Sequence, residues 1–115
     1  MANELGYSSS ASVTPYCIIR RQSDYAVWDA VAKTWDAWAD ADIGDYDILL
    51  TSRGGDYYSA DFPTTIAANT VVLILTYDRA GAAPAITDLR LASLVANWTG
   101  DLSPEPIGSL SLIHI

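Results

Sequence analysis

The chain has 115 residues, half of them hydrophobic, and carries a net charge of -8 at pH 7. This length suits a single domain with one core, and the apolar fraction argues against disorder away from the ends. The negative charge repels phosphate groups and anionic lipid heads, so neither nucleic acid nor a membrane surface is expected as a partner.

The N-terminal residues have neither the basic start nor the apolar run of a secretory signal, so we expect a protein made in the cytoplasm and kept there or released by lysis. No apolar run reaches the ~20 residues that cross a bilayer. Residues 1–14 are rich in Ser and small side chains and show no regular period. We expect them to form an N-terminal arm, flexible or lying on a neighbouring molecule.

The first strand is predicted at residues 16–21, a short β-prone run that ends in two Arg residues. It contains Cys17, the sole cysteine of the chain. We expect Cys17 to be a small buried hydrophobe, because one cysteine supports neither an internal disulfide nor a multi-cysteine metal site. Residues 25–28 follow a polar turn closely enough to pair with this strand as a hairpin.

The next segment, residues 27–38, fits two structures. Its apolar side chains recur at spacings of four, four and three residues: Val27, Val31, Trp35 and Trp38. On a short amphipathic helix they would share one face. The Asp residues among them favour turns, however, and no pair of capping residues frames a helix. We therefore favour a hairpin of residues 27–29 and 34–38, with the short helix as the alternative.

Two further strands are predicted on either side of a turn signal at Gly54-Gly55. Residues 46–51 form the first, and residues 57–62 form its hairpin partner, which ends at Pro63. Alternate side chains of a strand share a face. One face of the second strand should therefore carry Tyr58, Ala60 and Phe62.

The central strand is predicted at residues 70–77, which are apolar on both faces. Such a strand is covered on both sides, so Leu73 and Leu75 should be buried. A loop then leads to a long strand over residues 87–98. Beyond a break that contains two prolines, residues 107–115 alternate in character and predict a terminal strand.

Together these elements predict an all-β domain, an antiparallel two-sheet β-sandwich of immunoglobulin-like shape with about seven strands. The sandwich would span residues 15–115, including the C-terminal strand at residues 107–115, and the flexible N-terminal arm would precede it. The Cys and Trp spacing of antibody domains is absent. The prediction therefore concerns the arrangement of the strands and does not assign the chain to the antibody-domain family.

The chain contains a series of turn and core motifs, which are, in order, residues 16–20, Val27-Trp28-Asp29, Thr34-Trp35, residues 46–51, residues 58–63, residues 77–84 and Asn97-Trp98-Thr99-Gly100. Over residues 13–101 this order resembles small β-sandwich proteins encoded among phage and prophage structural genes. The resemblance implies a structural role in a virion, and none of its motifs is a catalytic signature. The family pattern often has Gly where this chain has Asn69.

A cluster of carboxylates is the strongest candidate for a metal site. Five of them lie within twelve residues: Asp36, Asp40, Asp42, Asp45 and Asp47. The last four are a weak candidate for Ca²⁺, since the segment is similar to a helix-loop-helix calcium loop. The Gly and Asp at its centre stand in the wrong order, and Thr51 replaces the bidentate Glu. We expect a solvated acidic loop and no cofactor, with Ca²⁺ as the alternative.

No arrangement of residues supports catalysis. A nucleophilic triad needs a base, and the only histidine, His114, stands next to the end of the chain. Asp56 and Asp61 lie on a predicted hairpin, where carboxylates are usually surface groups. Gly54-Gly55 lacks the spacing of a phosphate-binding loop. We therefore expect that the chain is not an enzyme.

Two groups of residues are candidates for contacts with other molecules. Most of the four Trp and seven Tyr side chains should fill the core, but Trp35, Trp38 and Tyr57 lie next to loops and are candidate interface anchors, or platforms for sugars. The second group is apolar and follows the proline break: Leu110, Leu112, Ile113 and Ile115. That segment would pair within its own sheet or add to the sheet of a neighbour.

These observations predict a non-enzymatic structural component of a phage virion, a capsid decoration or head or tail accessory protein that acts by assembly. Its partners would be copies of itself and a shell or tail protein, so we expect a homo-oligomer or a lattice-bound protein located in the virion. The alternatives are a glycan-binding or host-surface-binding module and a donor-strand filament subunit.

Overall fold

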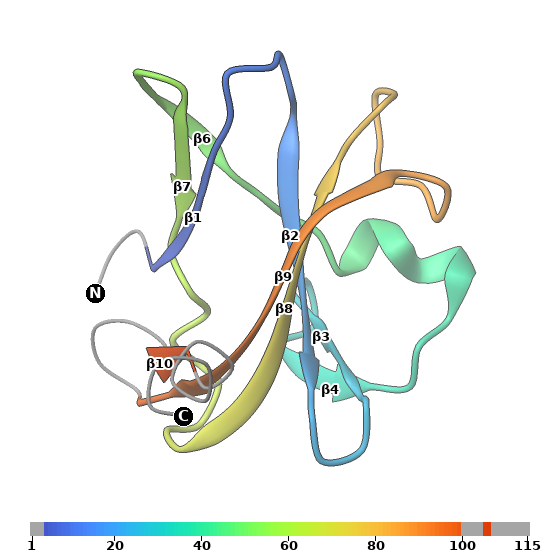
Figure 1. The fold of residues 1–115 in the computed structure, drawn as a ribbon. Helices are drawn as coiled ribbons and strands as arrows, with labels where there is room; N and C mark the ends of the chain where they lie inside the picture. The colour runs from blue at the N-terminus through green and yellow to red at the C-terminus, as the bar shows by residue number, and fades with distance from the viewer. Residues whose placement is uncertain (1–3, 100–104, 107–115) are drawn as a thin grey trace.

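The computed structural model describes residues 4–99 and 105–106. This part of the chain folds into two antiparallel sheets with one short 3-10 helix (Figure 1). The elements in chain order are β1 (Leu5–Ser8), β2 (Pro15–Arg21), β3 (Val27–Asp29), β4 (Thr34–Asp36), η1 (Asp40–Asp45), β5 (Ile48–Leu49), β6 (Thr51–Gly54), β7 (Tyr57–Ala60), β8 (Thr70–Asp78), β9 (Leu89–Trp98) and β10 (Glu105–Pro106). The strands outnumber the predicted seven because several are only two to four residues long.

The larger sheet has the strand order β10-β9-β8-β2-β3-β4, and β5 pairs with the first part of β2. The predicted central strand is confirmed: β8 lies between β9 and β2 and pairs with both along most of its length (Figure 1). The strand predicted at residues 87–98 begins two residues later, at Leu89. The terminal strand predicted at residues 107–115 lies outside the described residues.

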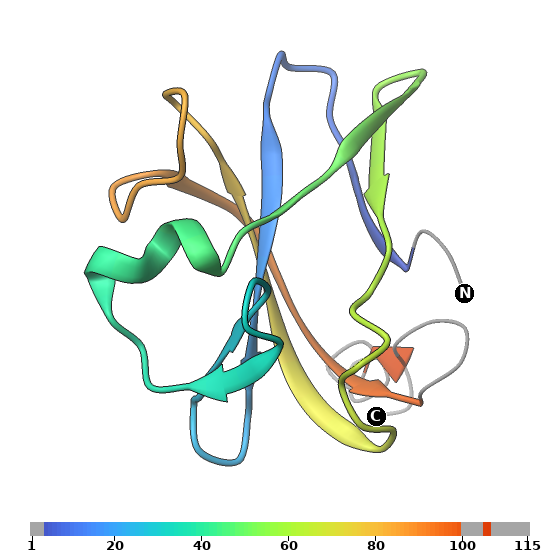
Figure 2. The ribbon, with the colours of Figure 1, turned by 180° about the vertical axis from the view of Figure 1, so that it is seen from behind.

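The smaller sheet has the order β1-β7-β6. The prediction of one strand over residues 46–51 is wrong, because the chain changes sheet at Leu50. The side chain of Leu50 is buried in the core, and its amide donates to the carbonyl of Pro15 at 3.0 Å. The run is therefore divided between β5 in the larger sheet and β6 in the smaller one. Figure 2 shows the chain crossing from η1 over the larger sheet to β6.

The expectation of an N-terminal arm does not hold for residues 5–8. They form β1, which pairs with β7 in a register that sets Leu5 opposite Ala60. The Leu5 side chain is buried in the core. At Gly6 an added Cβ would stand 2.5 Å from the Tyr57 hydroxyl, so the missing side chain lets the Tyr57 ring lie over β1.

The main core lies between the two sheets. Its buried members come from both sheets and from the connections between them: Leu5, Cys17, Ile19, Trp28, Leu50, Phe62, Ile66, Val72, Ile74, Ala96 and Trp98. As predicted, Tyr58 and Ala60 pack on the same core as Phe62. Two antiparallel sheets around this core are compatible with the predicted β-sandwich.

A second, smaller cluster covers the opposite face of the larger sheet. Its buried members are Tyr16, Ile18, Val27 and Tyr46, and Trp38, Ile43 and Tyr77 pack against them. Because alternate residues of a strand face opposite sides, β2 supplies both clusters. The smaller sheet and η1 accordingly lie on opposite sides of the larger sheet (Figures 1 and 2).

The burial of β8 follows the same alternation. Val72 and Ile74 lie in the main core, and Leu75 is buried on the other face. Leu73 is only half-buried, so its predicted burial is wrong. The smaller cluster that covers this face does not include Leu73.

The hairpin predicted within residues 27–38 is confirmed, and the helical alternative is wrong. β3 and β4 pair with Trp28 opposite Trp35, although β4 ends at Asp36 rather than at residue 38. The Asp29 carboxylate accepts hydrogen bonds from the amides of Val31 and Ala32, and these bonds set the turn. Because Asp29 bonds to the backbone of its own turn, residues 27–38 form a hairpin although the spacing of their apolar residues also fits a helix.

Asn69 adopts a left-handed backbone conformation in the turn before β8. Its φ is 66°, a region that Gly adopts freely and that Asn tolerates better than most residues. The amide of Asn69 donates to the carbonyl of Trp98 at 2.6 Å, just before β8 begins. Asn is therefore one of the few residues with a side chain that suit this turn.

Candidate functional site: the tip of the β2–β3 hairpin

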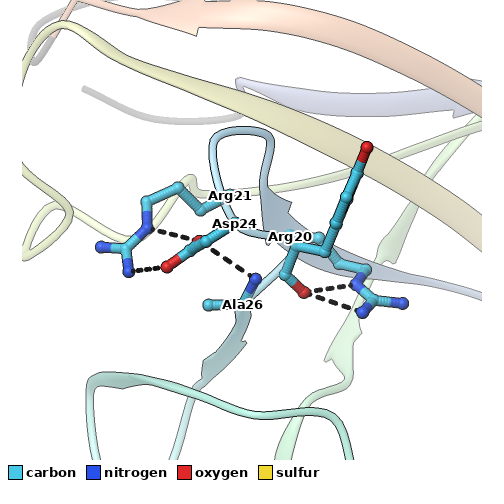
Figure 3. A network of polar contacts seen from close by, with 5 residues as sticks. Arg20, Arg21, Asp24 and Ala26 are labelled. Atoms are coloured by element: carbon cyan, nitrogen blue, oxygen red, sulfur yellow. Dashed lines mark hydrogen bonds and ion pairs between the residues drawn. The ribbon is translucent and has the colours of Figure 1, made fainter.

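The tip of the β2–β3 hairpin, residues 20–26, is held by a network of polar contacts (Figure 3). Arg21 donates from Nε and Nη2 to the two carboxylate oxygens of Asp24, at 3.0 and 2.7 Å. The Asp24 carboxylate also accepts from the amide of Ala26 at 3.2 Å. The bonds from Arg21 are the main reason that the pKa of Asp24 is lowered to about 2. Asp24 is therefore ionised across the physiological range.

The other arginine of the tip holds the backbone. Arg20 donates from Nε and Nη2 to the carbonyl oxygen of Tyr25, at 3.0 and 2.7 Å. The amide of Tyr25 donates to the carbonyl of Arg21 at 2.8 Å. Both peptide groups of Tyr25 are thus fixed by hydrogen bonds.

Tyr25 occupies a strained conformation and faces solvent. Its φ is 62°, in the left-handed region that bulky side chains avoid, and its side chain is 68% exposed. Such a backbone costs about 1 to 3 kcal/mol, and this kind of strain is concentrated at functional sites. An exposed ring contributes little to the core, so core packing does not account for the strain.

Each arginine also joins the tip to one of the two hydrophobic clusters. The Arg21 guanidinium lies 5.0 Å from the centre of the Trp35 ring, and the Trp35 ring packs against that of Trp28 in the main core. The Arg20 guanidinium lies 5.2 Å from the centre of the Trp38 ring. Trp38 packs in turn on Tyr46 of the smaller cluster. The tip is therefore braced from both faces of the sheet.

The predicted interface residues have different surroundings. Trp35 and Trp38 are half-buried and pack within the chain, as just described. Tyr57 is 43% exposed on β7. Leu110, Leu112, Ile113 and Ile115 lie outside the described residues. Tyr25 was not predicted as a candidate from the sequence. The one available signal was the spacing of Arg21 and Asp24, which lie three residues apart in the polar turn that precedes Tyr25.

The acidic segment forms η1 and the turn that follows it. Asp40, Asp42 and Asp45 lie in η1, and Asp40 accepts a hydrogen bond from the indole of Trp38. Burial raises the pKa of Asp47 above its ordinary value. Among the residues that the structure describes, no three or more His, Cys, Asp or Glu side chains are grouped so as to hold a metal ion.

Cys17, Asp56 and Asp61 lie in different parts of the fold. Cys17 is buried in β2, as predicted, and its sulfur lies 3.3 Å from the Thr76 hydroxyl. Burial raises the pKa of the Cys17 thiol to about 11, so the thiol stays protonated at neutral pH. Asp56 lies in the turn between β6 and β7, Asp61 follows β7 on the surface, and His114 lies outside the described residues.

The fold places the chain in the class of all-β domains built from two antiparallel sheets. In the described part of the chain, no helix has the length and apolar character needed to span a bilayer. Comparisons with protein-family models, with curated proteins and with solved structures find no match.

Proposed function

We propose that this chain is a non-enzymatic structural component of a phage virion, a capsid decoration protein or a head or tail accessory, which acts by binding other proteins. The sandwich would be of the immunoglobulin-like type. The observation that carries the binding role is the braced hairpin tip with its exposed, strained Tyr25. The virion setting rests on the resemblance of the sequence to phage structural proteins.

A braced tip suits protein binding for two physical reasons. A loop already held in one conformation loses little entropy when a partner binds it. Tyrosine and arginine are also the side chains that most often supply binding energy at the centre of an interface. The tip presents Tyr25 beside Arg20 and the Arg21–Asp24 pair. We infer a partner surface with a pocket for an aromatic ring, on a shell or tail protein.

The tip also differs in charge from the rest of the chain. It carries two arginines and one aspartate, whereas the whole chain has a net charge of -8. Like charges across an interface oppose binding, so an acidic domain approaches a neutral or acidic partner best through a locally basic surface. The tip is such a surface.

A glycan-binding module is the second candidate, because exposed tyrosine rings at Tyr25 and Tyr57 offer faces on which a sugar can stack. Trp35 and Trp38 fit this role less well, since an arginine already stacks on each of them. A glycan array with and without a chelator separates the two candidates. Binding to a defined glycan would favour the module, and a blank array favours the virion protein.

The test of the virion role uses particles purified from a lysed culture of a strain that encodes this chain. Mass spectrometry should find the chain in the particles, and its copy number would separate a capsid or tail tube from a neck or baseplate. A chain that is absent from the particles would contradict the virion role.

The role of the tip is tested with Tyr25→Gly, which removes the ring and relieves the strain at φ 62°. We expect the variant to fold at least as stably as the wild type and to be lost from the particles. Val31→Gly removes another exposed apolar side chain, in the neighbouring β3–β4 turn, and should stay bound. Equal incorporation of both variants would show that the tip is not the binding element.

A further inference from the structure

A hollow of about 400 Å³ lies at the base of the hairpin tip, between the tip and the segment that leads into β8. This volume is in the range of pockets that bind ligands. One wall belongs to the tip and the other to the start of β8; together they consist of Arg21, Gln22, Ser23, Asn69, Thr70 and Val71. The tip that we propose as a binding element therefore includes a concave surface close to Tyr25.

Hydrogen bonds hold the two walls of the hollow in place. The amide of Gln22 donates to the carbonyl of Val71 at 3.0 Å and so joins one wall to the other. The Thr70 hydroxyl donates to the carbonyl of Ala67 at 2.7 Å, and the amide of Asn69 is held by the carbonyl of Trp98. A hollow with fixed walls loses little entropy when a ligand enters it.

The walls carry hydrogen-bond donors that the fold does not use. Arg21 donates to Asp24 from Nε and Nη2, so its Nη1 has no partner in the described part of the chain, and the Arg21 side chain is 33% exposed. The side chains of Gln22, Ser23 and Asn69 are exposed and make no hydrogen bond with residues 4–99 or 105–106. Each of them has an N–H or O–H group to donate.

The charge of the walls favours an anionic ligand. Arg21 is a cation, and the walls contain no carboxylate, because Asp24 pairs with Arg21 outside the hollow. Two other hollows differ in this respect: one is lined by Glu4 without a basic residue, and the other is lined by both Lys33 and Asp61. Free donors beside a guanidinium suit a carboxylate, which only accepts hydrogen bonds and binds most strongly to charged donors.

We propose that this hollow receives an Asp or Glu carboxylate of the partner protein while Tyr25 contacts the same partner. Arg21 donates to this carboxylate from Nη1, and the side-chain amides of Gln22 and Asn69 donate from the two walls. The inference deepens the proposed function, on which it rests, by placing an acidic side chain on the partner beside its pocket for an aromatic ring.

Acetate tests the hollow on the purified chain, because it carries the carboxylate of the proposed ligand. Acetamide has nearly the same shape without the charge and is the matched probe. In a nuclear magnetic resonance titration at pH 7 and constant ionic strength, acetate should shift the backbone amide signals of residues 21–23 and 69–71 in a saturable way, and acetamide should not. Equal shifts with both probes, or no shift of these signals with acetate, would overturn the proposal.

Two substitutions at Asn69 separate charge from shape. Asn69→Asp adds a negative charge to the hollow, and Asp also tolerates the left-handed backbone of this turn. We expect it to weaken acetate binding at least about tenfold. Asn69→Gly, the matched control, suits the same turn and removes one donor without adding charge, so it should weaken acetate binding less.

Gln22→Glu adds the same charge from the opposite wall and should also weaken acetate binding at least about tenfold. It provides the measurement if Asn69→Asp does not fold. A folded acidic variant that binds acetate as well as the wild type does would contradict the proposed site.

Incorporation into particles links the hollow to the partner. Asn69→Asp should be lost from particles to a greater extent than Asn69→Gly, and Val31→Asp, which adds the same charge at an exposed turn, should stay bound. If Tyr25→Gly is lost while Asn69→Asp stays bound, the tip keeps its role and the inference about the hollow is wrong. A chain that binds acetate in the hollow but is absent from particles would keep the carboxylate site and remove the virion role.

Discussion

The phenol of Tyr16 donates a 2.6 Å hydrogen bond to the carboxylate of Asp88, which lies 72 residues further along the chain. Asp88 also accepts from the amides of Ala85 and Ala80, at 2.9 and 3.3 Å, and so closes the loop that precedes β9. Burial opposes the charge on Asp88, but these hydrogen bonds outweigh it, and the pKa of Asp88 lies below its ordinary value. Burial, together with this bond, raises the pKa of Tyr16 well above its ordinary value.

We expect Tyr16→Phe to lower the free energy of unfolding by about 1 to 3 kcal/mol at neutral pH, because it removes a hydrogen bond to a charged group. A carboxyl whose pKa is lowered by folding stabilises the fold above its unfolded pKa of about 4, and this stabilisation is lost as the pH falls through the folded value. The difference between the variant and the wild type should therefore narrow in acid. Urea unfolding at pH 7 and at about pH 3 measures this difference in the free energy of unfolding. If Tyr16→Phe loses the same free energy at both pH values, the role of Asp88 is contradicted.

Two neighbouring residues of β8 should respond differently to truncation. Ile74 is buried in the main core, so Ile74→Ala should cost about 2 to 5 kcal/mol. Leu73 is half-buried on the other face, so Leu73→Ala should cost clearly less. Urea unfolding of the two variants gives the comparison. A larger loss at Leu73 would mean that something covers this face of the sheet in solution.

The place of β1 in the fold is tested by Leu5→Ala. Leu5 is 2% exposed, so we expect a loss of about 2 to 5 kcal/mol, as for other core truncations. Leu89→Ala, the same substitution on a largely exposed side chain, should change stability by less than about 0.5 kcal/mol. If both variants unfold at the wild-type midpoint, residues 5–8 are an arm after all.

Removal of residues 107–115 tests the predicted assembly role of a segment that lies outside the described residues. Its residues Ser109, Leu110, Ser111 and Leu112 alternate polar and apolar side chains, as in a strand. We expect the shortened chain to keep its urea midpoint and to lose particle binding. A lower midpoint would assign the segment to the chain's own core, and a chain unchanged in both measurements would refute the role.

Much of the strand pattern follows from local sequence. The run of residues 70–77 carries apolar side chains on both faces, as expected of a strand in the middle of a sheet, and it forms the central strand β8. Tyr58, Ala60 and Phe62 alternate with polar residues, and they pack on the core as that alternation predicts. Asp residues that set a turn favoured the hairpin of β3 and β4 over the helical spacing of its tryptophans.

The candidate site was not predictable in the same way. The sequence predicts Arg20 and Arg21 as the charged end of a strand that leaves the core. The spacing of Arg21 and Asp24 is a weak signal of their contact, but nothing in the sequence shows that Arg20 holds the carbonyl of Tyr25. The left-handed φ of Tyr25 is a property of the folded turn, which the sequence pattern of a tyrosine in a polar loop does not reveal.

By itself the sequence determined the class of the fold and most of the strands, because alternation, turn residues and apolar content act over a few neighbouring positions. Tertiary structure alone decided that Leu5 joins β7, that the chain changes sheet at Leu50 and that Tyr16 binds Asp88. These contacts join residues far apart in the chain, and the free energy that selects them comes from the whole fold, so no local pattern encodes them.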